Sequence, residues 1–307
     1  MNSLNDDCIY NILLFVPIKT IINCSLINKQ FKRCYEREML WMLKVSNIYE
    51  NYLKDKTWFD TYKLNTILSY LMEFIKVKEP LIKFYNTKSI IINVQSQYVP
   101  KGICKLINLE ELYIFNNMIK EIPVEIGDLI NLRILSFPNN QIKKIPIQIG
   151  KLINLEILNL FNNKIKEIPK EIGKLIRLRI LYLSDNEIKV LGNEIGNLIN
   201  LENLDLDNNV IKEIPKELEN LINLRQLDIA YNKIEEIPKN LWNLINLTGL
   251  HLNNNEIEVI PKKIGKLINL EMLYLSYNRI KEIPKEINNL TNLRYFDLSK
   301  YQIKTKD

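Results

Sequence analysis

Glycine, cysteine and histidine are scarce in this chain: its 307 residues include 8 Gly, 4 Cys and 1 His. The glycines lie mainly in Ile-Gly pairs, so the sequence contains no Gly-rich phosphate-binding loop. The single histidine, His251, stands in a column of positions that recurs along the chain, which favours a surface residue over a catalytic base. We therefore expect a protein that is not an enzyme and that binds no cofactor.

None of the cysteines forms a Cys-x-x-Cys pair, and a structural zinc site has no obvious ligand set. The sequence also lacks an apolar run of about 18 residues, the length that a membrane span needs. The short apolar stretch 11–18 follows Asp6 and Asp7, whereas a secretory signal carries basic residues there. We expect no metal, no membrane contact and reduced thiols in the cytoplasm, with the nucleus also open. The cysteines are Cys8, Cys24, Cys34 and Cys104.

The formal net charge is +6, from 42 Lys and Arg against 36 Asp and Glu. The two signs alternate closely, as in KIKEIPKEIGKL from Lys164, which is typical of a solvated face. A nucleic-acid-binding surface would show a one-sided basic stripe, so we expect no nucleic acid partner and no basic pocket for a phosphorylated substrate. The heavy use of Ile, Asn and Lys indicates an AT-rich genome. A viral origin is one hypothesis, and it would place the protein in the host cytoplasm.

A unit of 23 residues repeats from residue 109 onward without insertions. One copy, 154–176, reads NLEILNLFNNKIKEIPKEIGKLI, and its proline recurs in register with one interruption at Gly192. The pattern L-x-x-L-x-L-x-x-N-x-I resembles the leucine-rich-repeat family in its short form. The asparagine of this pattern recurs at Asn117, Asn140, Asn163, Asn186, Asn209, Asn232, Asn255 and Asn278.

The leucine-rich-repeat resemblance implies a solenoid with a curved parallel sheet on its concave face. Leu158 and Leu160 are spaced by two, as strand residues facing one side must be, and stacked coils bury them. The asparagine can satisfy backbone groups of its own turn and of the next coil, so we expect a buried ladder. Proline suits an extended return arm on the convex side.

The solenoid is predicted to span 86–307 and to have atypical repeats at both ends. Residues 86–108 form a degenerate repeat in which Ile91 keeps the register and Val94 replaces the asparagine. A partial ninth unit begins at Leu293, with Tyr301 at the asparagine position.

Side chains between the inward leucines point to the concave face, because neighbours along a strand alternate. The first four repeats place apolar residues there and the middle repeats place acids, which favours a protein-binding surface that prefers a basic partner segment. Two alternatives stay open. Strands favour Ile, Phe and Tyr in any case, or the N-terminal region covers some of these residues. The predicted substrate-binding residues are Tyr113, Phe115, Ile134, Ile157, Phe161, Ile180, Tyr182, Asp205, Asp207, Asp228 and Tyr274.

Residues 4–44 do not fit the repeat and indicate three short helices. Asn5 or Asp6 caps the first helix, and Pro17 ends it. The segment resembles the F-box, although Asn5 stands where that family usually has proline. The matching positions are Leu4, Ile9, Ile12, Leu13, Phe15, Val16, Pro17, Ile21, Ile27, Phe31, Leu40 and Trp41.

The F-box resemblance implies that these residues dock the Skp-type adaptor of a cullin-RING, or SCF-type, ubiquitin ligase. The solenoid would then hold a protein substrate close to the ubiquitin-charged enzyme, which is catalysis by proximity. The expected fold class is α+β: a three-helix F-box-like domain at 1–44, a helical linker or N-terminal cap at 45–85, and the solenoid. We expect a monomer. The alternative is an interaction scaffold without a ubiquitin role, in which the N-terminal helices serve as a cap.

Overall fold

The chain divides into two compact units, 1–85 and 86–307. In the first unit, residues 67–73 are helical and helix α5 spans Leu81–Tyr85. The three-helix domain predicted at 1–44 lies outside the described residues. Within the described part of the chain, no helix is long and apolar enough to cross a bilayer. The computed structural model describes residues 67–73, 75–76, 81–93 and 96–299.

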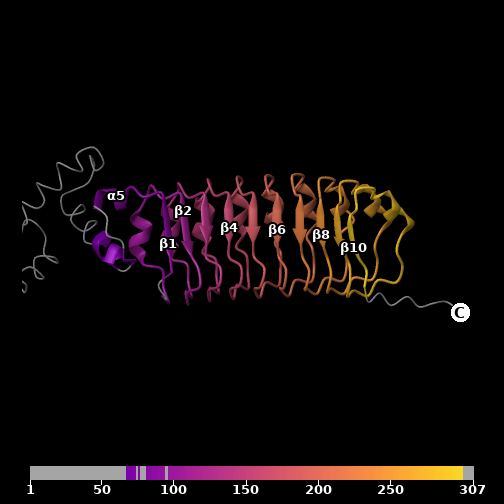
Figure 1. The fold of residues 1–307 in the computed structure, drawn as a ribbon, viewed down its shortest axis with the longest axis horizontal. Helices are drawn as coiled ribbons and strands as arrows, with labels where there is room; N and C mark the ends of the chain where they lie inside the picture. The colour runs from indigo at the N-terminus through magenta and orange to yellow at the C-terminus, as the bar shows by residue number, and fades with distance from the viewer. Residues whose placement is uncertain (1–66, 74, 77–80, 94–95, 300–307) are drawn as a thin grey trace, which may run out of the picture. The chain divides into compact units, whose positions relative to one another are not determined.

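Ten parallel strands form a single sheet in the second unit, in chain order from β1 to β10 (Figure 1). From β2 onward each strand pairs with residues one repeat further along, as Leu158 does with Leu181. The 23-residue spacing therefore sets the register, and the predicted leucine-rich-repeat solenoid is confirmed. The strands are β1 (Ser89–Ile92), β2 (Glu111–Ile114), β3 (Ile134–Ser136), β4 (Ile157–Asn159), β5 (Ile180–Tyr182), β6 (Asn203–Asp205), β7 (Gln226–Asp228), β8 (Gly249–His251), β9 (Met272–Tyr274) and β10 (Tyr295–Asp297).

The first strand departs from the predicted register. In the pairing of β1 with β2, Ile92 lies opposite Ile114 and Ile91 lies opposite Tyr113. Ile92 is buried, whereas Ile91 is 63% exposed. The prediction that Ile91 keeps the core register is therefore wrong, because this first coil is one residue shorter than the coils that follow.

A short 3-10 helix lies on the return arm of each coil. Pro169 has φ −68° and ψ 144°, which is the extended conformation predicted for the proline. The 3-10 helix that follows it is not predicted by the sequence pattern, because such runs are too short to show a period. Gly192 adopts φ −67° and ψ 157° and so takes the place of the missing proline. These helices are η1 (Lys101–Lys105), η2 (Val124–Asp128), η3 (Ile147–Lys151), η4 (Lys170–Lys174), η5 (Asn193–Asn197), η6 (Lys216–Asn220), η7 (Leu241–Asn243), η8 (Lys262–Lys266) and η9 (Lys285–Asn289).

The Ile-Gly pairs of the 3-10 helices allow adjacent coils to approach each other closely. A Cβ placed on Gly196 would lie only 2.4 Å from the carbonyl oxygen of Glu217 in the next coil. Any larger side chain would push the two coils apart. Glycine therefore permits the close approach at this position, whereas Glu219 and Trp242 occupy the equivalent position in η6 and η7.

The asparagine ladder closes the core where each chain segment leaves the sheet. Asn163 donates from Nδ2 to the carbonyl oxygens of Phe137 at 2.9 Å and Leu160 at 3.0 Å. Its Oδ1 accepts the backbone N–H of Ile142 at 2.9 Å. The predicted ladder is confirmed, but it joins each coil to the preceding coil, where Phe137 and Ile142 lie, rather than to the next one.

Candidate protein-binding face

The open sheet face consists of the strand side chains that point away from the core, on the side predicted to be concave. In β4, Ile157 and Asn159 flank the buried Leu158 and are partly exposed. The strand pairing aligns such positions in columns, and Ile134, Ile157 and Ile180 lie side by side on β3, β4 and β5. The three predicted isoleucines therefore form one continuous apolar strip.

The predicted aromatic residues lie around this strip but do not contact one another through the sheet pairing. Tyr113 and Tyr182 share the next column, and two polar residues separate them. Phe115 and Phe161 follow β2 and β4, and both are half-buried. The aromatic side chains therefore extend the isoleucine strip into a partly exposed surface over β2 to β5.

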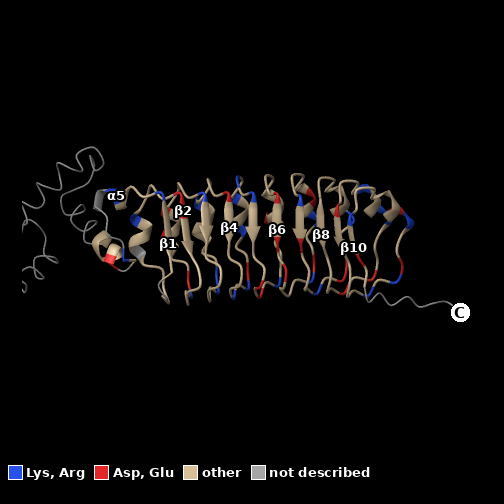
Figure 2. Cartoon of the chain, in the orientation of Figure 1, with Lys and Arg blue, Asp and Glu red and all other residues tan. Residues whose placement is uncertain are grey.

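Three acids occupy the middle of the open sheet face. Asp205 and Asp228 are direct neighbours on β6 and β7. Ser184 donates its hydroxyl to Oδ2 of Asp205 at 2.8 Å, and the backbone N–H of Asp207 donates to Oδ1 of Asp205 at 3.1 Å. The backbone N–H of Ala230 donates to Oδ1 of Asp228 at 3.0 Å. These bonds fix the carboxylates in place, and Figure 2 shows that charges of both signs are interspersed elsewhere along the solenoid.

Burial raises the pKa of two of these acids. The pKa of Asp207 rises to about 6, because burial and the nearby carboxylates of Asp228 and Asp205 disfavour its charged form. Burial also raises the pKa of Asp205. Oδ1 of Asp207 is buried without a hydrogen-bond partner within the described part of the chain. The cluster is thus an electrostatically unfavourable arrangement that a bound cation would relieve.

His251 also belongs to this cluster, and the sequence did not predict it as a site residue. Its Nδ1 lies 2.8 Å from Oδ2 of Asp228, and its ring packs edge-on against Tyr274 with a centroid distance of 4.7 Å. The 23-residue repeat indicates that these residues are neighbours, because Asp228, His251 and Tyr274 occupy one column. Among the residues that the structure describes, no group of His, Cys, Asp or Glu has the arrangement of a metal site.

Three family models match the chain. The F-box domain matches residues 1–42, a leucine-rich repeat region matches 124–240, and a leucine-rich repeat model matches 245–303. A comparison with curated proteins found no match. F-box domains and leucine-rich repeats are typically protein-binding modules, so the chain combines two such modules.

Solved structures share the solenoid. A leucine-rich-repeat protein of Leptospira interrogans is 36% identical with a TM-score of 0.71, and the match covers 76% of this chain and 60% of that one. The ectodomain of the Arabidopsis thaliana receptor kinase GASSHO1/SCHENGEN3, in complex with CASPARIAN STRIP INTEGRITY FACTOR 2, is 29% identical with a TM-score of 0.66, covering 70% and 27%.

The Arabidopsis receptor kinase HAESA, in complex with the peptide hormone IDA and the co-receptor SERK1, is 33% identical with a TM-score of 0.61. That match covers 66% of this chain and 35% of the receptor. The chain therefore spans less than two thirds of the length of each of these relatives. The F-box match and the two leucine-rich-repeat matches show the family: the chain belongs to the F-box/leucine-rich-repeat proteins.

Proposed function

We propose that the chain is the substrate-recognition subunit of a cullin-RING ubiquitin ligase. The observation that carries the proposal is an F-box match at 1–42 in the same chain as leucine-rich-repeat matches at 124–240 and 245–303. The F-box docks the Skp-type adaptor through the apolar positions of its helices, and the solenoid holds the substrate. The chain supplies proximity rather than chemistry, since holding the substrate beside the ubiquitin-charged enzyme raises its effective concentration. It acts in the cytoplasm and is a monomer before it joins the ligase.

The open sheet face is the proposed substrate-binding surface. Its isoleucine strip offers apolar contact, and its acids favour a substrate segment that carries Lys or Arg. The uncompensated carboxylate of Asp207 supports this preference, because a cation placed beside it would lower its raised pKa and restore its charge. Asp228, held by His251, offers a second oriented carboxylate one strand further on.

Co-assembly tests the proposal. The full chain, mixed with the Skp-type adaptor and a cullin, should elute as one complex in size-exclusion chromatography. Leu13→Asp, at an apolar F-box position, should abolish co-elution, whereas Asp205→Asn on the solenoid should leave it intact. Asn5→Pro restores the residue usual in the family and should tighten adaptor binding by about threefold to tenfold, since proline fixes the chain before binding.

Failure of the intact, folded chain to join the adaptor, with no gain from Asn5→Pro, would remove the ubiquitin role. The circular dichroism of the solenoid provides the folding control. The protein would then be an interaction scaffold, which is the alternative that the sequence leaves open.

A further inference from the structure

Three residues on the return arms depart from the repeat, and all three line one groove. Gly192 stands where the other repeats have proline. Val190 takes a position that is charged in most other repeats, as in Glu167 and Glu213 on either side. Val210, in the next coil, takes a position that is polar or charged in most of them. The surface around this groove therefore differs from the equivalent surface of the other coils.

The return-arm groove lies between residues 189–193 of one coil and 210–215 of the next, and its volume is about 700 Å³. Its floor is apolar, because Leu191 and Ile214 line it and are only 4% and 6% exposed. Val190, in contrast, is 70% exposed. A concave site with an apolar floor can accept an apolar side chain from another molecule.

The rim of the return-arm groove is positively charged. Lys189, Lys212 and Lys233 line it, one from each of three consecutive coils. None of these lysines forms an ion pair within the part of the chain that the structure describes. Glu213 is the one acid among the groove residues, so two positive charges are not balanced. The charge of the rim therefore favours an occupant that carries acidic groups.

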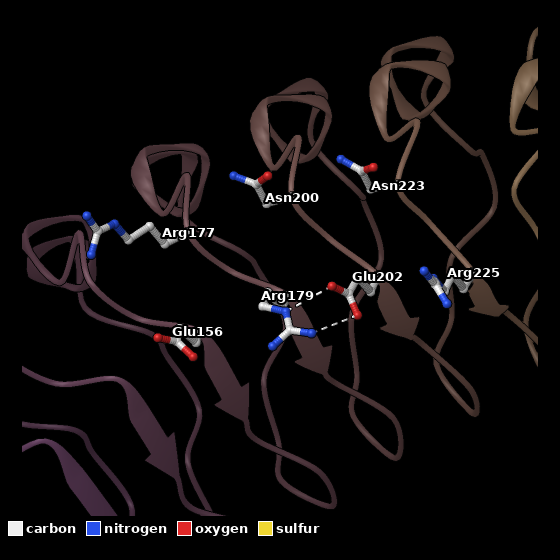
Figure 3. Close-up of a pocket in the computed structure, with 7 residues that line it drawn as sticks. All are labelled: Glu156, Arg177, Arg179, Asn200, Glu202, Asn223 and Arg225. Atoms are coloured by element: carbon white, nitrogen blue, oxygen red, sulfur yellow. Dashed lines mark hydrogen bonds and ion pairs between the residues drawn. The ribbon is translucent and has the colours of Figure 1, made fainter.

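A second pocket, at the edge where the chain enters the sheet, differs because its own ion pair occupies it (Figure 3). There Glu202 lies between Arg179 and Arg225, and Nε of Arg179 donates to Oε1 of Glu202 at 2.9 Å. A ligand would have to displace this pair. The described side chains that line the return-arm groove form no such pair, so an occupant would meet lysines that are free to bind it.

The backbone beside the return-arm groove suits an extended peptide. Near the C-terminal end of the solenoid, the N–H of Lys281 donates to the carbonyl oxygen of Glu258 in the preceding coil at 3.2 Å. In the described structure the equivalent N–H of Lys212 makes no such bond to Lys189, as in the neighbouring coils. An extended peptide can bond to backbone groups of this kind, as a strand does at a sheet edge.

We propose that the return-arm groove binds an extended peptide segment in which acidic residues flank an apolar side chain. The apolar side chain covers Val190 and Val210 and removes their surface from water. The carboxylates lie beside the lysines of the rim, where opposite charge selects them over basic segments. This site goes beyond the proposed ligase role: it lies on the return arms rather than on the open sheet face, and it does not depend on adaptor binding.

The test measures retention of the full chain on immobilised peptides that combine Asp and Glu with Leu, Ile and Phe. Val190→Glu introduces the residue of the adjacent coils and so keeps the fold, yet it places an acid in the groove and should reduce retention at least about fivefold. Gly192→Pro restores the proline of the repeat at a φ of −67° and should reduce retention by narrowing the groove. Val259→Glu makes the same change at the equivalent position of another coil, 64% exposed, and should leave retention unchanged.

The lysines are tested by Lys212→Gln with Lys233→Gln, which should weaken retention about threefold to tenfold. Lys143→Gln with Lys144→Gln removes the same charge from another coil and should have little effect. A second set of peptides, with Lys and Arg in place of the acids, should be retained equally by the wild type and by Val190→Glu.

Unchanged retention of the acidic peptides by Val190→Glu and Gly192→Pro would overturn the proposal. Equal losses in the two lysine double variants would also overturn it, because only net charge would then matter. A single-stranded oligonucleotide serves as a competitor, and we expect it to displace the acidic peptides only weakly. Displacement as effective as that by a free acidic peptide would assign the lysines to nucleic acid instead.

Discussion

His251 and Asp228 stand 23 residues apart in the sequence, and Nδ1 of the histidine lies 2.8 Å from Oδ2 of the aspartate. The repeat length places them on adjacent strands, opposite each other in the register of β7 and β8. Together with the backbone N–H of Ala230, which donates to Oδ1 of Asp228, the contact orients this carboxylate on the open sheet face. It also joins the acidic part of that face to Tyr274, against which the imidazole ring packs.

Charge reversal at two acids tests whether this face prefers a basic partner. Asp205→Lys combined with Asp228→Lys should weaken the binding of a Lys- and Arg-containing peptide library by at least about tenfold, because attraction becomes repulsion. Fluorescence anisotropy measures the affinity. A control with the same change in net charge, Glu167→Lys with Glu213→Lys, lies outside this face and should have a much smaller effect. Equal losses in both double variants would show that only net charge matters.

Asp207 makes stability depend on pH. Its pKa is raised to about 6 in the folded state, so between about pH 4 and pH 6 the folded chain holds a proton that the unfolded chain releases. The free energy of unfolding therefore falls as pH rises through this window. Asp207→Asn should raise it by about 1 kcal/mol at pH 7.5, after allowance for solvent screening, and should have little effect at pH 4.

Urea unfolding of the wild type and of Asp207→Asn at both pH values measures that difference. Asp185→Asn serves as a second variant in the same acidic region. A stabilisation of Asp207→Asn that is the same at pH 4 and pH 7.5 would contradict the raised pKa.

The asparagine ladder should carry much of the stability of each coil. Asn163→Ala removes the side-chain bonds to Phe137, Leu160 and Ile142 and leaves buried backbone groups without partners. We expect a loss of about 2–4 kcal/mol in the free energy of unfolding. Asn223→Ala, which breaks an exposed bond to the carbonyl oxygen of Ile199, should cost only about 1 kcal/mol. Similar losses for the two variants would mean that the ladder is not the main stabilising element.

The residue before each ladder asparagine has a positive φ, in the left-handed region. In two coils this residue is a tyrosine, which is poorly suited to that conformation. Tyr231 has φ 47° and is 53% exposed, whereas Asn208 and Asn254 hold the same position with φ 49° and 56°. Tyr231→Asn should raise the free energy of unfolding by about 0.5–1 kcal/mol, since asparagine tolerates this region better. Thermal unfolding measures it, and the reverse change Asn254→Tyr should destabilise. A destabilised Tyr231→Asn variant would show that the tyrosine ring makes up for the strain.

Sequence periodicity predicts the parts of the structure that recur in every coil. Leu158, Asn163 and Pro169 each appear at a fixed spacing, so their strand, ladder and extended positions follow from the repeat itself. The 3-10 helix Lys170–Lys174 does not follow, because five residues show no helical period. The repeat spacing places Ile91 in the core, but the first coil is one residue shorter than the others, and no turn signal in the sequence marks that loss.

The contact between His251 and Asp228 depends on a relation between adjacent coils. The repeat places His251 in the same column as Asp228, which lies one coil earlier, but periodicity alone does not show that the two side chains bond to each other.

The affinity of the chain for the Skp-type adaptor tests the central claim most directly. Isothermal titration calorimetry would compare the intact chain with a chain that lacks residues 1–44. The account predicts tight 1:1 binding by the intact chain and none by the shortened chain, with the solenoid equally folded in both. An intact, folded chain that gives no binding heat and no complex with the adaptor would contradict it.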